Sequence, residues 1–393
     1  MMTNPVIVVV AFNRIESLKR ICRSLDRMIE PQGDVSLIIS IDNNGGKNQD
    51  VIDYAHQYNW KFGPKEVRVK EKNTGLKAHI ISCGDLTEEF GDVIILEDDL
   101  FVSPYFLDYV KEAQQFYRNE EKIAGISLYN YRLTDIIWNN KLPFIPVTNH
   151  SDVYFMQIAS SWGQSWSREQ WKGFREWFNT DPDLSKITGM PYEVINWPKS
   201  SWKKFFIGYL VYTNKFFVYP NKSLSTNFND PGTHYFDRDH DAQSPLATVD
   251  PKIRFIPFSE AENVYDSYFE ITPATIKKHN KKMKDFDFEV DLYGTKRPQT
   301  IAKPYALTTK KCANPLMTFE RSLKPHELNV FYNIPGEDIF LCKTADLLQD
   351  TYLNTDLLRD YSYFYRQTFN RRELTMFIKQ LLKMKWIRIT SRK

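Results

Sequence analysis

The sequence predicts an α/β protein built on a mainly parallel, doubly wound sheet with helices on both faces. Short β-branched runs recur through the first third of the chain, and a segment of helical periodicity separates each run from the next. The first run is almost wholly apolar, as expected for a strand that is covered on both faces. Strands that alternate with helices of this length pair in parallel. The expected strands span residues 6–12, 35–42, 66–72 and 92–97.

Composition narrows the class of protein further. The chain has 393 residues, of which 42% are hydrophobic, so it can form a full core and an appended region. The net charge of +3 provides no global field that would favour nucleic acid as a partner. The apolar start is too short for a membrane span and lacks a basic region, so we expect a cytoplasmic protein, unless a targeting segment is missing. The cysteines lack C-x-x-C spacing, which predicts free thiols at Cys22, Cys83, Cys312 and Cys342.

Polar residues follow each of the four predicted strands. In doubly wound sheets, ligands bind beyond the carboxyl ends of the strands, so we expect these side chains to meet at one edge. A dense acidic cluster there is tolerated if a divalent cation offsets the repulsion, and carboxylate oxygens suit Mg²⁺ or Mn²⁺, which also bind substrate phosphates. In strand order, the residues are Asn13 and Arg14, then Asp42, then Asn73, Gly75 and Lys77, then Glu97, Asp98 and Asp99.

The stretch VIILEDDLFVSPYFLDY, residues 93–109, resembles the metal motif of GT-A glycosyltransferases. Within that family, it is most similar to the N-acetylglucosaminyltransferase I type and its bacterial relatives. The likeness continues in patches from about residue 5 to 235, with VVAFNR at the first strand, IISIDNNG at the second and SSWGQSWSREQW at an acceptor-side segment. Only the EDD stretch is specific by itself, but the pieces follow the family's order.

The resemblance implies a role for each matching residue. Asp99 would ligate the Mn²⁺ or Mg²⁺ that bridges the donor's diphosphate, and Asp98 and Glu97 would bind the ribose and support the site. Asp42 would accept a hydrogen bond from uracil, and Arg14 would contact the nucleotide or its phosphates. Asn73 and Lys77 would belong to the same donor side. His234, in a loop that ends in Thr-His, would complete the metal shell or contact phosphate, with a purely structural histidine as the alternative.

One position departs from the family pattern. Where relatives place an aspartate after a tryptophan, as the base that deprotonates the acceptor, this chain has Lys203 after Trp202. A protonated lysine cannot accept a proton, although burial can lower its pKa. Another carboxylate is then needed as the base, and the candidates are Asp230, which is favoured because it precedes the PGTH loop, Glu176 and Glu193. The lysine would also be explained by a different stereochemical course of the reaction, or by a degenerate family member that binds ligands without catalysing transfer.

The implied function is transfer of a sugar, with inversion, from a nucleotide sugar such as a UDP-sugar to a glycan or lipid-linked acceptor. The expected setting is the assembly of bacterial surface polysaccharide, such as capsule or lipopolysaccharide. A sugar nucleotidyltransferase is a second hypothesis, but the first strand is followed by no glycine-rich phosphate loop. A carbohydrate-binding protein without activity is a third. It is supported by Lys203 and by the tryptophan-rich stretch at 162–202, whose rings more simply fill a core.

The domain organisation follows from the same patterns. Residues 1–245 would form the catalytic domain, with a nucleotide-sugar half at 1–120 and an acceptor half at 121–245. Residues 246–393 would form a mainly helical accessory region, with helices expected at 272–286 and 343–365. The segment 370–393 alternates apolar residues with many Lys and Arg and carries a single acid. Such a segment suits either the inner face of the cytoplasmic membrane or docking on the body of the protein.

Overall fold

The computed structural model of the protein describes residues 4–134, 141–230 and 242–348, together with residues 359–360, 362–365, 374–376, 378–380 and 382. The chain divides into two compact units, residues 1–347 and residues 348–393. All the strands among the described residues, and the candidate site described below, belong to the first unit. The predicted division between residues 245 and 246 falls inside this unit and stays a prediction.

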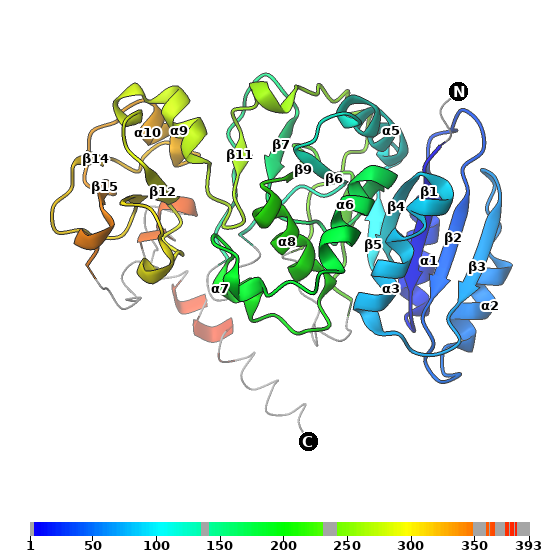
Figure 1. The fold of residues 1–393 in the computed structure, drawn as a ribbon. Coiled ribbons are helices and arrows are strands. Elements are labelled where there is room, and N and C mark those ends of the chain that lie inside the picture. Colours follow the sequence, from blue (N-terminus) through cyan, green and yellow to red (C-terminus); the bar gives the residue numbers. More distant parts are fainter. Residues whose placement is uncertain are drawn as a thin grey trace. The chain divides into compact units, whose positions relative to one another are not determined.

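A nine-stranded sheet forms the centre of the first unit (Figure 1). Strands β4, β1, β2 and β3 are mutually parallel, whereas β8 runs antiparallel to both of its neighbours, β4 and β6. The predicted fold class, α/β with a mainly parallel sheet, is therefore confirmed. In sheet order the strands are β11 (Val264–Tyr265), β7 (Val153–Met156), β9 (Phe216–Pro220), β6 (Ile123–Ser127), β8 (Gln164–Ser167), β4 (Asp92–Glu97), β1 (Val6–Ala11), β2 (Leu37–Ile41) and β3 (Lys65–Val69).

The order of the strands creates a switch point beside β1. The chain runs outward through β1, α1 (Ile15–Leu25), β2, α2 (Gln49–Gln57) and β3, then returns through α3 (Gly75–Gly84) to place β4 on the other side of β1. Because parallel crossovers are right-handed, the reversal puts α3 on the face opposite α1 and α2. The segments that follow β1 and β4 meet at this end of the sheet, since β5 (Leu100–Val102) packs against α1 and the backbone N–H of Val102 donates to the hydroxyl of Ser24. Open α/β sheets bind ligands beyond the carboxyl ends of their strands at such a switch point.

Aromatic side chains fill the layer between the sheet and two further helices, α6 (Arg168–Phe178) and α8 (Trp202–Thr213). Trp166 on β8 packs against Trp171 on α6 and Trp202 on α8, and all three are at most 2% exposed. Helix α3 reaches this layer because it ends in Gly84, where a Cβ atom would come within 2.4 Å of the Trp171 ring. These three tryptophans are therefore core residues, as the simpler of the two interpretations expected, and not a sugar-binding wall.

The region after residue 246 contains a second sheet. Short alternating runs rich in β-branched and aromatic residues form four strands there, so residues 288–343 are not mainly helical as predicted. Helix α9 (Pro273–His279) confirms the start of the helix expected at 272–286, which then continues only as a 3-10 turn. Most of the helix expected at 343–365 lies outside the described residues. In sheet order the strands are β12 (Phe288–Asp291), β13 (Tyr305–Thr308), β15 (Ile339–Lys343) and β14 (Met317–Phe319).

The remaining elements are short, apart from one longer helix. A two-stranded sheet pairs β5 with β10 in antiparallel fashion and lies directly after the acidic triplet. None of the helices in the described stretches is both long and apolar enough to cross a bilayer. The elements are β5 (Leu100–Val102), β10 (Ser225–Asn227), α4 (Thr87–Phe90), α5 (Phe106–Tyr117), α7 (Tyr192–Ile195) and α10 (Glu327–Phe331), with 3-10 turns η1 (Leu184–Lys186), η2 (Phe258–Glu260), η3 (Lys281–Met283), η4 (Pro298–Thr300) and η5 (Thr344–Asp346).

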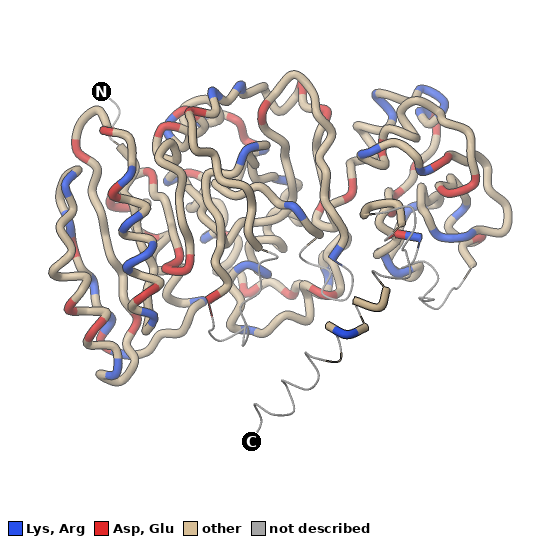
Figure 2. Tube along the Cα trace, turned by 180° about the vertical axis from the view of Figure 1, so that it is seen from behind, with Lys and Arg blue, Asp and Glu red and all other residues tan. Residues whose placement is uncertain are grey.

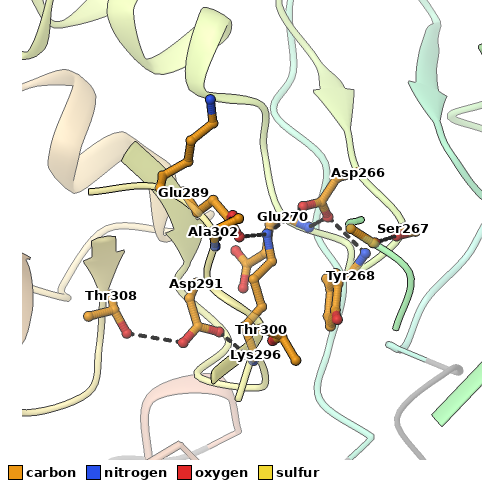
Figure 3. Close-up of polar contacts among 12 residues, drawn as sticks. Asp266, Ser267, Tyr268, Glu270, Glu289, Asp291, Lys296, Thr300, Ala302 and Thr308 are labelled. Carbon is orange, nitrogen blue, oxygen red and sulfur yellow. Dashed lines mark hydrogen bonds and ion pairs between the residues drawn. The ribbon is translucent and has the colours of Figure 1, made fainter. Parts of the chain in front are cut away.

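A buried polar cluster links the end of β11 to the second sheet (Figure 3). The ammonium of Lys296 lies 2.8 Å from a carboxylate oxygen of Asp266, which follows β11, and 3.8 Å from Glu289 on β12. Asp291, which is fully buried, accepts hydrogen bonds from the backbone N–H of Lys296 and from the hydroxyl of Thr308. Burial lowers the pKa of Lys296, but the surrounding carboxylates outweigh it and raise that pKa above its ordinary value.

Candidate active site

The acidic triplet lies at the carboxyl end of β4, next to the switch point. Asp98 and Asp99 are 2% and 9% exposed, and Glu97 is half-buried. The backbone N–H of Asp98 donates to the carbonyl of Val10 on β1, which continues the β1 and β4 pairing one residue beyond β4. The three acids therefore do not point into open solvent. They are held between the ends of two adjacent parallel strands.

Arg14, which follows β1, binds two of the three acids. Its Nε lies 3.4 Å from Oδ2 of Asp98 and its Nη2 donates to Oδ1 of the same carboxylate, in a bidentate pair. Its Nη1 lies 3.2 Å from Oδ2 of Asp99 and 3.4 Å from the backbone oxygen of Asp230. In the structure, the charge that offsets the acidic cluster is thus the guanidinium of Arg14.

Asp99 is fixed from a third direction by the segment that contains β10. Asn227 donates from Nδ2 to Oδ1 of Asp99 at 3.1 Å, and the backbone N–H of Phe228 donates to the Asp99 carbonyl at 3.0 Å. This contact exists because β10 pairs with β5, whose first residue, Leu100, lies opposite Asn227. Each carboxylate oxygen of Asp99 therefore has a hydrogen-bond partner, which fixes the orientation of the side chain.

Burial controls the protonation of the triplet. Burial first, and then the charge of Asp99, raises the pKa of Glu97 to about 8, against the opposing effects of Arg14 and Lys203. Burial likewise raises the pKa of Asp98 to about 6, although Arg14 lowers it, and raises the pKa of Asp99. A shift in this direction favours the neutral form of Glu97, which reduces the repulsion within the cluster.

Asp230 lies beside the cluster, but its carboxylate is already bound. Oδ2 accepts hydrogen bonds from the hydroxyl of Ser17 at 2.6 Å and from Arg20. Burial raises the pKa of Asp230, but Arg20 and Ser17 outweigh it and the pKa is held below its ordinary value. A carboxylate stabilised as the anion in this way is a weak base.

Asp42, at the end of β2, organises a loop. Its oxygens accept hydrogen bonds from the backbone N–H groups of Asn43, Thr74 and Gly75, and from the hydroxyl of Thr74. Gly75 has a φ of +74°, which glycine adopts without strain, so the chain can turn into α3 there. Burial raises the pKa of Asp42, but the backbone donors outweigh it and lower the pKa. Asp42 therefore fixes the polar loop that was predicted to border the donor.

Asn73, Lys77 and Glu176 contact residues outside the acidic triplet. Asn73 is exposed and donates to the carbonyl of Asn43 at 2.9 Å, while Lys77 lies over the ring of Phe205 at 5.0 Å. Glu176 forms a surface ion pair with Lys172 on α6. No contact between the described residues joins Glu176, or Glu193 on α7, to the acidic triplet. His234 lies outside the described residues, so its predicted role remains a prediction.

Lys203 is buried at the start of α8. Its ammonium donates to the hydroxyl of Tyr131 at 3.0 Å and lies within 5.8 Å of the ring centres of Tyr131, Trp162 and Trp197. Its charge also lowers the pKa of Glu97, so this buried ammonium lies near the triplet. The position at which the resemblance implied a base is thus occupied by a cation surrounded by aromatic rings.

The chemistry of these residues fits a divalent cation that arrives together with a diphosphate. Among the residues that the structure describes, no three His, Cys, Asp or Glu side chains converge to hold a metal ion alone. Mg²⁺ and Mn²⁺ need only one or two carboxylates when phosphates supply further oxygens. Asp99, with Asp98 beside it, offers such oxygens at the switch point, although both residues are bound to Arg14.

Two surface depressions, of about 220 and 350 Å³, lie at the other end of β4. They share Arg118, Ser167 and Glu169 among their lining residues. Since β4 begins at Asp92, which lines the smaller one, these depressions are remote from the acidic triplet along the strand. They do not belong to the candidate site.

Ser17, Arg20 and Asn227 are site residues that sequence reasoning missed. Arg14, Ser17 and Arg20 are spaced three residues apart at the start of α1, which places them on one side of the helix. That polar spacing was a readable signal. Asn227 carries no such signal, because its contact with Asp99 joins positions 128 residues apart.

Comparison with known proteins gives matches to solved structures only. No protein-family model matches the sequence, and neither does any curated protein. Residues 1–349 of Staphylococcus aureus TarS match with a TM-score of 0.35 at 10% identity, over 56% of this chain and 59% of that one. The mannosyltransferase PcManGT of Pyrobaculum calidifontis, in complex with GDP-Man and Mn²⁺, matches with a TM-score of 0.31 at 10% identity, over 45% and 47%.

A third match is GalNAc-T7 with UDP, GalNAc and Mn²⁺. Its TM-score is 0.35 at 12% identity, over 56% of this chain and 42% of that one. The chain thus spans about half the length of the structures that it matches. The likeness to solved glycosyltransferases is partial and of low identity.

Proposed function

We propose that the protein is a glycosyltransferase that moves a sugar from a nucleotide sugar, most simply a UDP-sugar, to a glycan or lipid-linked acceptor. The observation that carries this proposal is the meeting of Asp98, Asp99 and Arg14 at the switch point of a doubly wound sheet. This is the crevice where such sheets bind nucleotides. Carboxylates and a guanidinium together suit a metal and a diphosphate.

The mechanism follows from what each residue offers. Asp99, supported by Asp98, would hold a Mn²⁺ or Mg²⁺ ion, which would neutralise the departing diphosphate. Arg14, which is bound to the same two aspartates, would donate to the phosphate oxygens. The loop fixed by Asp42 would border the nucleotide. A carboxylate would deprotonate the acceptor hydroxyl, with inversion at the anomeric carbon, and Asp230, Glu176 and Glu193 stay candidates for this base.

The proposal is tested by incubating the protein with a panel of UDP-sugars and Mn²⁺ and measuring the UDP released. We expect slow cleavage of one UDP-sugar without an acceptor, and a raised melting temperature with that donor, because ligand bound only to the native state stabilises it. Binding without any cleavage of the panel would instead favour the carbohydrate-binding hypothesis. Formation of a UDP-sugar and pyrophosphate from UTP and a sugar 1-phosphate would favour the nucleotidyltransferase.

We further propose that a bacterial surface polysaccharide is the product and that the second unit touches the inner face of the cytoplasmic membrane. In its described stretches, Leu374, Met376, Ile378 and Leu382 are between 50% and 63% exposed, within a segment rich in Lys and Arg. Apolar and cationic side chains together suit an anionic lipid surface.

Sedimentation of the full chain with lipid vesicles tests the membrane contact. We expect binding to vesicles of phosphatidylcholine with phosphatidylglycerol, weaker binding to phosphatidylcholine alone, and loss of binding in an I378D/L382D double variant. Equal sedimentation of the wild type and the double variant would contradict a role for this segment. Equal binding to both vesicle types would show that charge is not involved.

A further inference from the structure

Arg14 and a divalent cation would need the same oxygens. The guanidinium occupies both carboxylate oxygens of Asp98 and one of Asp99, while Asn227 occupies the other oxygen of Asp99. A cation at Asp99 would therefore sit next to the positive charge of Arg14 and would have to displace its Nη1 contact. Like charges at this distance repel strongly in a buried site.

The guanidinium of Arg14 is also suited to bind phosphate oxygens in place of the two aspartates. Its side chain is about one quarter exposed, whereas that of Asp98 is almost fully buried. It follows β1, on the loop side of the switch point, where a donor's phosphates would lie. A diphosphate would give the guanidinium other anionic oxygens, which it can bind in bidentate fashion in place of the two aspartates.

We propose that Arg14 is a positioning residue that makes metal binding depend on the nucleotide. Without a diphosphate, Arg14 neutralises Asp98 and Asp99 and competes with the cation. With a diphosphate, Arg14 turns to the phosphates and leaves Asp99 to the metal. This inference rests on the proposed function for the identity of the diphosphate, but its central claim concerns only the competition between Arg14 and the metal.

The test measures Mn²⁺ affinity by titration calorimetry or electron paramagnetic resonance, in full-length protein without any sugar donor. In an R14M variant, the affinity for Mn²⁺ alone should rise about tenfold or more, because the competing charge is gone. In the wild type, UDP should tighten Mn²⁺ binding, and Mn²⁺ should tighten UDP binding by the same factor. In R14M, UDP and Mn²⁺ should tighten each other's binding by a smaller factor than in the wild type. An R118M variant, changed at the far end of β4, should match the wild type.

Mn²⁺ affinity in R14M that is equal to or weaker than in the wild type would overturn the inference. If R14M does not fold, R14K provides the second arm, since it keeps the charge but loses the bidentate geometry, and Mn²⁺ should then bind more tightly than in the wild type but less than tenfold. No tightening by UDP in the wild type would also overturn it. A protein that cleaves no sugar donor yet gains Mn²⁺ affinity in R14M would refute the proposed function and leave the competition standing.

Discussion

Replacing Asp99 by asparagine should abolish sugar transfer. The asparagine oxygen can still accept the hydrogen bond from Asn227, but the side chain loses the negative charge that a divalent cation requires. The cation stabilises charge that develops on the leaving diphosphate, so we expect kcat to fall about a thousandfold or more. Removing the metal from the wild type with EDTA should have a similar effect. The measurement is the initial rate of UDP release with the UDP-sugar that the panel selects.

A matched control lies on the same strand. Asp92 begins β4 at its other end and pairs at the surface with Arg118 at 3.0 Å. Asp92→Asn should keep transfer within about twofold of the wild type, because surface substitutions away from the site change little. Full activity of Asp99→Asn, or of the wild type in EDTA, would contradict a metal role at Asp99.

Replacing Lys296 by methionine should cause the largest loss of stability. Lys296 is almost fully buried and is the cation beside Asp266 and Glu289, while Asp291 binds its backbone N–H. Removing one partner of a buried ion pair leaves the other charge uncompensated, which costs about 3–5 kcal/mol. The free energy of unfolding, measured by urea denaturation, should fall by that amount.

Lys303 provides the comparison. It pairs with Asp287 at 3.2 Å, but both side chains are about half exposed or more. Such pairs contribute less than about 1 kcal/mol, so Lys303→Met should leave the unfolding curve almost unchanged. Equal effects of the two substitutions would show that the cluster around Lys296 does not tie the second sheet to the first.

Local patterns were enough to predict the first four strands. The β-branched runs at 6–12, 35–42, 66–72 and 92–97 became β1, β2, β3 and β4 with small shifts at their ends. The runs that form β1, β2 and β4 are short, continuous and mostly buried, so their sequence pattern and their environment agree, whereas β3 at the edge of the sheet is partly exposed. The strands of the second sheet were missed because runs of three to five residues, such as Met317–Phe319, carry too little periodicity.

The position of the candidate site was predictable from the sequence, but the contacts between its residues were not. The switch-point rule located Asp42, Asp98 and Asp99, since it depends only on strand order. The partners of these residues depend on burial and on contacts between distant positions. Arg14 reaches Asp98 across 84 residues, and Figure 2 shows that basic and acidic residues are scattered over the trace, so no sequence pattern selects that pair. From the sequence we expected a metal ion to offset the negative charge of the acids. In the structure, the guanidinium of Arg14 offsets charge there.

The most direct test of the central claim is the position of Mn²⁺ in crystals grown with UDP. The anomalous signal of manganese distinguishes the ion from a bound water molecule. We predict a peak within about 2.5 Å of a carboxylate oxygen of Asp99, with the UDP diphosphate completing its ligands. A bound UDP with manganese ligated elsewhere, away from Asp98 and Asp99, would contradict the account.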